Sequence, residues 1–183
     1  MRELALHLLD IAENSISAGA KNIAIRVEED TETDCLRMSV QDDGMGMDPE
    51  MVARVTDPFT TTRTTRKVGL GIPLLKAAAE ACNGWFEIQS TPGKGTHVQV
   101  EFQRSHIDRM PLGNLADTYI SLVLGAPHIH WLLSYQVNGN AFVFDDEPIK
   151  EELDGISLTE PAVISFLRDY IGVGISNIQL EEN

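Results

Sequence analysis

The sequence has few cysteines and no long apolar run, and each absence excludes a class of protein. Its 183 residues include two cysteines, Cys35 and Cys82. Two thiols cannot form a disulfide framework or supply four ligands to a structural zinc ion. No apolar run approaches the roughly 20 residues that cross a bilayer, and Met1 leads directly into an amphipathic segment without the features of a signal peptide. We therefore expect a cytoplasmic protein that does not contact a membrane.

Basic side chains are also scarce. The chain has 14 Lys and Arg against 28 Asp and Glu, a formal net charge of -14. Non-specific binding of nucleic acid requires clustered Lys and Arg, so we exclude nucleic acid as a partner. The imbalance is uneven, because residues 1–104 hold 11 basic and 16 acidic side chains whereas residues 105–183 hold 3 and 12. This shift predicts two domains, 1–104 and 105–183.

Hydrophobic periodicity in residues 1–104 predicts alternating groups of helices and strands. Leu4, Leu8 and Ile11 recur at helical spacing, whereas Ile23, Ile25 and Val27 alternate with other residues as in a half-buried strand. The expected elements are a helix over 2–17, strands over 23–27 and 36–40 joined by an acidic loop over 28–34, a short helix from Asp48, a helix over 69–82, and strands over 85–90 and 96–103. This order predicts an α/β (α+β) sandwich, a mixed and mostly antiparallel sheet with helices on one face.

Residues 105–183 predict a small acidic α/β appendage. A linker over 110–113 precedes a helix over 115–124, and Asn138-Gly139-Asn140 is a strong hairpin signal between two strands. A last helix is expected from Pro161 to Tyr170, ended by Gly172. The acidity of this region suggests a module that docks a protein.

Asp10 and Asn14 lie four residues apart on the first helix, so both side chains share one face. The carbonyl oxygen of Asn is a suitable ligand for Mg²⁺ beside waters and phosphate oxygens. A carboxylate one turn earlier is placed to act as a general base.

Asp42-Asp43-Gly44-Met45-Gly46 directly follows a predicted strand. A carboxylate at a strand end can accept a hydrogen bond from an exocyclic amine, and glycines let a flat ring approach the backbone.

A third feature is the polar loop that ends in Gly69-Leu70-Gly71 at a predicted helix start. The backbone N–H groups and the dipole of such a helix favour a phosphate chain. Arg63, Arg66 and Lys67 add positive charge at the same place. Each feature alone is weakly specific, but the three together in this order indicate a nucleotide site.

With these motifs in place, residues 3–103 resemble the ATP-binding domain shared by DNA gyrase, the large heat-shock chaperone, histidine kinases and mismatch-repair ATPases, the GHKL superfamily with the Bergerat fold. Five sequence boxes carry the resemblance: Asp10-Ile11-Ala12-Glu13-Asn14, Asp42 to Gly46, Asp57-Pro58-Phe59-Thr60-Thr61-Thr62, Val68-Gly69-Leu70-Gly71-Ile72, and Ser90 to Thr96.

The resemblance implies a role for each matching residue and names ATP and Mg²⁺ as the ligands. Asn14 would bind Mg²⁺, Asp42 would hydrogen-bond the adenine amine, and Asp10 would be the catalytic base. Gly44 and Gly46 would shape the adenine pocket, and Thr96 would help the adenine contact, directly or through water. Residues 58–68 would form a lid over ATP, and the remaining residues expected to contact ATP are Phe59, Thr61, Thr62, Arg63, Arg66, Lys67, Gly69, Leu70 and Gly71.

Two departures from the family pattern leave the branch open. Members that hydrolyse ATP with a general base have Glu where this chain has Asp10, and Asp is one methylene shorter. The segment from Asn14 to Ala20 resembles the mismatch-repair version, whereas the lid and the last box resemble histidine kinases.

Other residues have competing interpretations. Residues 105–112 partly resemble a phosphoacceptor box with His106 as the acceptor, but the acidic residue is displaced and His106 follows a strand, so a plain linker is favoured. His128 and His130 are favoured as a surface or hydrogen-bonded pair over metal ligands. Lys150 is a weak alternative contact for a γ-phosphate.

The sequence therefore predicts an Mg-ATP-binding regulator in signal transduction. It would transfer phosphate to an unidentified protein partner, in the manner of an anti-sigma-factor kinase or a split histidine kinase. The alternative is a nucleotide-gated interaction switch with slow hydrolysis. The sequence leaves the oligomeric state open.

Overall fold

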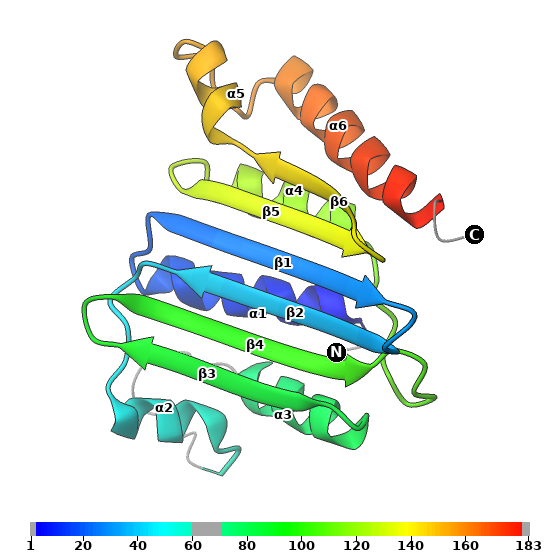
Figure 1. Cartoon of the computed structure of the whole chain (residues 1–183). Helices are drawn as coiled ribbons and strands as arrows, with labels where there is room; N and C mark the ends of the chain where they lie inside the picture. The colour runs from blue at the N-terminus through cyan, green and yellow to red at the C-terminus, as the bar shows by residue number, and fades with distance from the viewer. Residues whose placement is uncertain (1–2, 60–70, 181–183) are drawn as a thin grey trace.

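A six-stranded sheet forms one layer of the computed structural model, which describes residues 3–59 and 71–180 (Figure 1). Its strands lie in the order β3-β4-β2-β1-β5-β6, and the β1–β5 pair is parallel whereas the other neighbouring pairs are antiparallel. The strands are β1 Asn22–Asp30, β2 Cys35–Asp42, β3 Trp85–Thr91, β4 Gly95–Gln103, β5 His130–Val137 and β6 Asn140–Asp145. The predicted mixed sandwich is confirmed.

Helices cover one face of this sheet, with α1 and α4 behind the strands in Figure 1. The helices among the described residues are α1 Leu4–Ser17, α2 Pro49–Thr56, α3 Gly71–Ala81, α4 Leu115–Gly125, α5 Glu147–Glu152 and α6 Pro161–Leu180. The covered face is apolar because alternate strand residues such as Ile23, Ile25 and Val27 point toward the helices and are buried. Trp131 and Tyr119 are the largest fully buried side chains.

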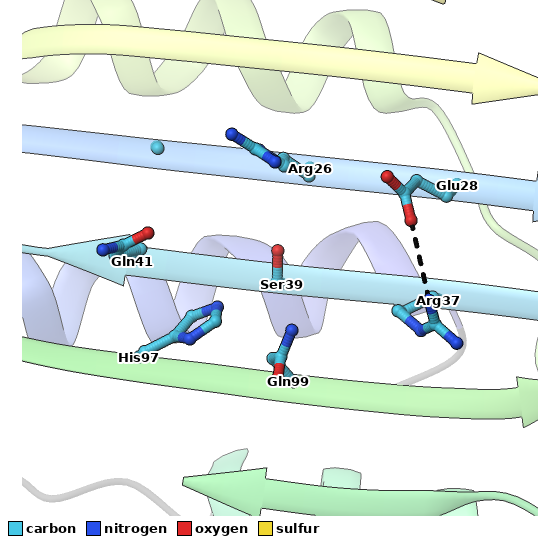
Figure 2. Close-up of a pocket in the computed structure, with 8 residues that line it drawn as sticks. Arg26, Glu28, Arg37, Ser39, Gln41, His97 and Gln99 are labelled. Carbon is cyan, nitrogen blue, oxygen red and sulfur yellow. Dashed lines mark ion pairs between the residues drawn. The ribbon is translucent and has the colours of Figure 1, made fainter. Parts of the chain in front are cut away.

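The opposite face of the sheet is open and polar. It carries a shallow hollow of about 200 Å³, in which Arg37 lies 4.0 Å from Glu28 and also forms an ion pair with Glu101 (Figure 2). The lining residues are Ala24, Arg26, Glu28, Arg37, Ser39, Gln41, His97 and Gln99. This hollow contains none of the residues predicted to bind ATP.

The acidic loop expected over residues 28–34 is shorter than predicted. Both strands extend into it, so that Asp30 pairs with Cys35 and only a turn remains between them. The reason lies at Glu29, whose carboxylate accepts hydrogen bonds from the Tyr135 hydroxyl at 2.8 Å and from Arg104 Nε at 2.8 Å. Because distant residues satisfy this charge, an acidic residue occupies a buried strand position.

The last helix is longer than predicted, since α6 continues through Gly172 to Leu180. Ile175 and Ile178 continue the buried stripe on α6 beyond the glycine, and this packing outweighs the roughly 1 kcal/mol cost of Gly in a helix. The short helix α5 was not predicted. Among the described residues no helix is both long and apolar enough to cross a membrane.

The C-terminal region extends the same sheet. Strand β5 pairs with β1 along Asn22–Glu29, and α4 contacts α1. One continuous buried cluster includes residues from both sides of Arg104. The expected linker also closes the start of α1, because the N–H groups of Leu4 and Ala5 donate to the carbonyls of Pro111 and Leu112 at 3.0 and 2.9 Å. The domain boundary after residue 104 stays a prediction.

Candidate functional site

A mostly apolar cavity of about 150 Å³ lies between α1, α2, α3 and the adjoining ends of β2 and β4. Four residues predicted to bind nucleotide or metal line it together: Asn14, Asp42, Gly46 and Thr96. The other lining residues are Ile11, Ser15, Ser17, Ala18, Met45, Met47, Met51, Val55, Ile72, Ile88 and Val98. The size and character of the cavity suit a flat aromatic ring that also needs a polar contact.

The Asp42 carboxylate is held in a fixed orientation at the end of β2. Its Oδ2 accepts a hydrogen bond from Ser15 Oγ at 2.6 Å, and its Oδ1 accepts one from the Gly44 N–H at 2.9 Å. An ionised carboxylate has about four acceptor positions, so capacity remains for a ligand donor. From the sequence we assigned no role to Ser15, which directly follows Asn14, the last residue of the first box.

Thr96 lies directly across the sheet from Asp42 in the β2–β4 pairing. Its Oγ1 is 2.8 Å from Ser90 Oγ, which also accepts a hydrogen bond from the Met47 N–H at 2.8 Å. Ser90 therefore connects the Thr96 hydroxyl to the loop that carries Gly46. The two hydroxyls and the Asp42 carboxylate form the polar end of the pocket.

The predicted glycines are required by close backbone contacts. Gly46 has φ +66°, and a Cβ at this position would overlap the carbonyl oxygen of Thr91. A Cβ at Gly44 would lie 3.0 Å from both Ala18 Cβ and Asp42 Oδ1. A side chain at either position would therefore require the surrounding backbone to shift.

Asp10 lies beside the start of α3 and does not line the cavity. A Cβ at Gly71 would lie 2.8 Å from Asp10 Oδ2, so the glycine leaves room for this carboxylate. The N-terminal end of a helix favours a negative charge. The structure therefore places Asp10 next to Gly71, while their roles stay predictions.

His7, one turn before Asp10, is 2% exposed. Burial lowers the pKa of its imidazole, against the opposing effects of the Asp10 carboxylate and of a hydrogen bond to the Gly71 backbone. Within the described part of the chain, His7 Nδ1 has no hydrogen-bond partner. The neutral form of the His7 imidazole is therefore favoured, close to the Asp10 carboxylate.

Asp43 has a structural role, unlike Asp42 beside it. Its carboxylate accepts hydrogen bonds from the N–H groups of Lys21 and Asn22 at 2.7 and 2.9 Å, and from Asn22 Nδ2 at 2.7 Å. Burial raises the pKa of Asp43, but the hydrogen bonds outweigh it and hold the pKa below its usual value. Asn22 Oδ1 is in turn 3.0 Å from His130 Nδ1, and His130 Nε2 is 2.9 Å from Asp145 Oδ1.

The other residues predicted to contact ATP either do not line the cavity or lie outside the described residues. Phe59 is 94% exposed and does not line the cavity. Seven predicted contacts lie outside the described residues: Thr61, Thr62, Arg63, Arg66, Lys67, Gly69 and Leu70.

His106 and Lys150 are engaged elsewhere. His106 lies in a turn after β4, where its Nδ1 accepts a hydrogen bond from the Asp108 N–H at 3.2 Å. Thr96 is near the other end of β4, roughly 25 Å away at about 3.4 Å per residue. Lys150 forms an ion pair at 2.6 Å with the fully buried Asp146.

Curated relatives that match this chain include sensor kinases. The chain is 43% identical over 89 residues to the sensor protein kinase FleS of Pseudomonas aeruginosa, covering 49% of this chain and 22% of that protein. It is 33% identical over 111 residues to the non-motile and phage-resistance protein of Caulobacter vibrioides, covering 56% of this chain and 13% of that protein. The chain thus spans less than a quarter of the length of these relatives.

Solved structures with a similar fold include the ATPase domain of MutL from Aquifex aeolicus in complex with ADP. The TM-score is 0.51 at 13% identity, over 84% of this chain and 68% of that one. The N-terminal domain of a DNA repair protein aligns with a TM-score of 0.55 at 15% identity, over 78% of this chain and 52% of that one. Both comparisons support the fold alone.

Residues 2–106 match the family model of the histidine kinase-, DNA gyrase B- and HSP90-like ATPases. This match covers more than half of the chain and includes every residue predicted to bind the nucleotide. The chain belongs to this family, HATPase_c, and contains its ATP-binding domain, which is related to the catalytic domains of histidine kinases.

Proposed function

We propose that this protein binds Mg-ATP in the cavity beside Asp42 and transfers the γ-phosphoryl group to a hydroxyl or imidazole of a partner protein. The observation that carries the proposal is the oriented Asp42 carboxylate, fixed by Ser15 and Gly44 at the polar end of an apolar cavity. The likeness to sensor kinases supports phosphotransfer as the reaction.

Adenine fits the cavity by both shape and donor pattern. Its exocyclic amine donates to Asp42, and its faces pack against apolar side chains such as Met51 and Ile88. The preference for adenine then rests on its exocyclic amine, which can donate to the acceptor capacity that Asp42 retains beside its bonds from Ser15 and Gly44.

Asn14 is the residue that would hold Mg²⁺. It lines the cavity and offers one neutral oxygen, which suits an ion that keeps waters and phosphate oxygens as its other ligands. Bound there, Mg²⁺ would neutralise charge on the phosphates. We assign no other described residue as a ligand of Mg²⁺.

Asp10 would orient the accepting group or take its proton. Its carboxylate lies at the start of α3, beside Gly71 of the second glycine box. Asp reaches one methylene less far than the Glu of the hydrolysing relatives, which disfavours activation of water and favours transfer to a group that the partner brings. Positioning and charge neutralisation would provide most of the catalysis.

One observation favours the alternative, a nucleotide-gated interaction switch. A chain of hydrogen bonds runs from Asp43 through Asn22 and His130 to Asp145, and so connects the first glycine box to the C-terminal strands. In this alternative, ATP binding would bias the C-terminal surface toward a partner, and slow hydrolysis would reset it.

Asp42→Asn tests the site, with Asp43→Asn as the matched control. The substituted side chain would present an amide N–H₂ in place of one carboxylate oxygen, so we expect ATP affinity measured by titration calorimetry to fall at least about 100-fold. Asp43→Asn should lower thermal stability but change ATP affinity less than about threefold. Equal losses of affinity in both variants would contradict the assignment of the pocket.

ATP labelled at the γ-phosphate distinguishes the reactions. Stable label on a partner protein, lost with Asp10→Asn while ATP still binds, supports the kinase. Free phosphate alone, also lost with Asp10→Asn, supports the switch. Label on His106 would establish it as the acceptor and would require a second subunit, given the distance from the pocket.

A further inference from the structure

Helix α6 has two apolar stripes, of which one is buried. Leu167, Ile171, Ile175 and Ile178 are at most 8% exposed and face β5, β6 and α4. This stripe accounts for the attachment of α6 to the sheet. In Figure 1 the helix lies on the outer side of β6, the last strand of the sheet.

The second stripe is exposed and turned away from the first. Phe166 is 53% exposed, Tyr170 45% and Val173 59%. Together with Asn177 these residues follow one another at steps of four, three and four, which is the spacing of the a and d positions of a heptad. Such a stripe packs well against another helix of the same pattern.

The exposed stripe borders a preformed groove of about 530 Å³. The Tyr170 ring is stacked on Phe166 at a centroid distance of 5.8 Å and lies 5.8 Å from Phe142 of β6. Gly174 leaves the space into which the Phe142 ring packs, since a Cβ there would overlap that ring. The aromatic side chains therefore hold one another in place without a partner.

We propose that this groove and stripe bind a second copy of this chain, in a two-fold dimer with antiparallel α6 helices. Charge is the first argument. Asp169 is the one charged residue among the seven that line the groove, in a chain of net charge -14. A basic or acidic partner would find almost nothing to pair with here, whereas an identical neutral surface meets little repulsion.

The register of this pairing is the second argument. With the two-fold axis between residues 171 and 172, Tyr170 of one copy faces Val173 of the other, and Phe166 faces Asn177. Asp169 then faces Gly174, so that no second charged side chain lies opposite the carboxylate. The same surface is thus complementary to itself, as a two-fold interface requires.

The available area is the third argument. Phe166, Tyr170, Val173 and Phe142 leave about 300 Å² of apolar surface uncovered on each copy. Two copies would remove about 600 Å², and because interfaces are about 60% apolar the total would be about 1,000 Å². This is the lower limit of a specific interface, so we expect a reversible dimer with a dissociation constant in the micromolar range.

Sedimentation velocity of the full chain over a concentration series tests the proposal. Wild type should shift from monomer to dimer as concentration rises, and Tyr170→Glu should remain monomeric. Ile107→Glu is the matched control, because Ile107 is 93% exposed outside the patch and receives the same charge. Unchanged thermal melting of Tyr170→Glu would show that the fold is intact.

Cross-linking tests the antiparallel register. An equimolar mixture of Tyr170→Cys and Val173→Cys proteins should form an intersubunit disulfide faster than either variant alone. A chain that stays monomeric at every concentration, or a dimer that Tyr170→Glu does not weaken, overturns the proposal and leaves the groove to a different protein.

Discussion

Single backbone contacts define the loop at the polar end of the cavity. Gly46 combines a positive φ with contact to the Thr91 carbonyl, so neither its conformation nor its space admits a side chain. Gly139 in the β5–β6 turn also has a positive φ, +89°, but a Cβ there would meet nothing within 4 Å. A substitution at Gly139 therefore introduces conformational strain alone, whereas a substitution at Gly46 adds steric overlap.

Gly46→Ala should cost about 3 kcal/mol or more of unfolding free energy and weaken ATP binding at least about tenfold, because the loop must move. Gly139→Ala should cost about 1–2 kcal/mol from the positive φ and leave ATP affinity unchanged. Urea denaturation and titration calorimetry measure the two effects. Equal ATP affinities in the two variants would rule out close packing at Gly46 as a determinant of the pocket.

At the scale of elements, helix α2 contributes one wall of the cavity through Met51 and Val55. Its first turn is stabilised by Asp48, whose carboxylate accepts a hydrogen bond from the Met51 N–H at 2.8 Å. Asn114 caps α4 in the same way, accepting from the Asp117 N–H at 3.0 Å, away from the cavity.

Asp48→Ala and Asn114→Ala should each lower stability by about 1 kcal/mol, since each removes one N-cap. Only Asp48→Ala should also weaken ATP binding, by about threefold to tenfold, because fraying of α2 opens the wall of the pocket. Thermal melting and ATP titration give the comparison. If both caps affect ATP affinity alike, the effect is one of global stability and α2 has no particular role.

At the scale of the whole molecule, the C-terminal region supplies part of the structure that supports the ATP site. Strand β5 pairs with β1, and Tyr135 of β5 donates to the nearly buried Glu29 carboxylate at 2.8 Å. Burial raises the pKa of the Tyr135 hydroxyl, with the Glu29 charge adding to the effect. Removal of residues 105–183 would expose one edge of β1 and leave Glu29 without this donor.

A chain shortened to residues 1–104 should therefore melt without a cooperative transition or well below the full chain. Tyr135→Phe in the full chain tests the same contact more gently and should cost about 1–3 kcal/mol, because a buried acceptor loses its donor. Circular dichroism follows both. A shortened chain that melts as cooperatively as the full one would instead support an independent domain ending at residue 104.

The sequence was sufficient to predict the sandwich, the N-cap at Asp48 and four of the residues that line the cavity. Alternation and helical spacing depend on neighbours within a few residues, and the boxes place Asn14, Asp42, Gly46 and Thr96 at the ends of such elements. The sandwich and the N-cap follow from short-range geometry, whereas the resemblance of the boxes to the GHKL superfamily implied the four cavity residues.

Other features depend on contacts between residues far apart in sequence. The Ser15–Asp42 hydrogen bond joins positions 27 residues apart, and the parallel β1–β5 pairing joins segments more than 100 residues apart. The same holds for the acidic strand ends, because Glu29 is stabilised there by Arg104 and Tyr135. The shift in charge along the chain predicted a domain boundary after residue 104, and that boundary stays a prediction. No local preference encodes the partner of a strand, so only the tertiary structure shows that β5 and β6 join the same sheet as β1–β4.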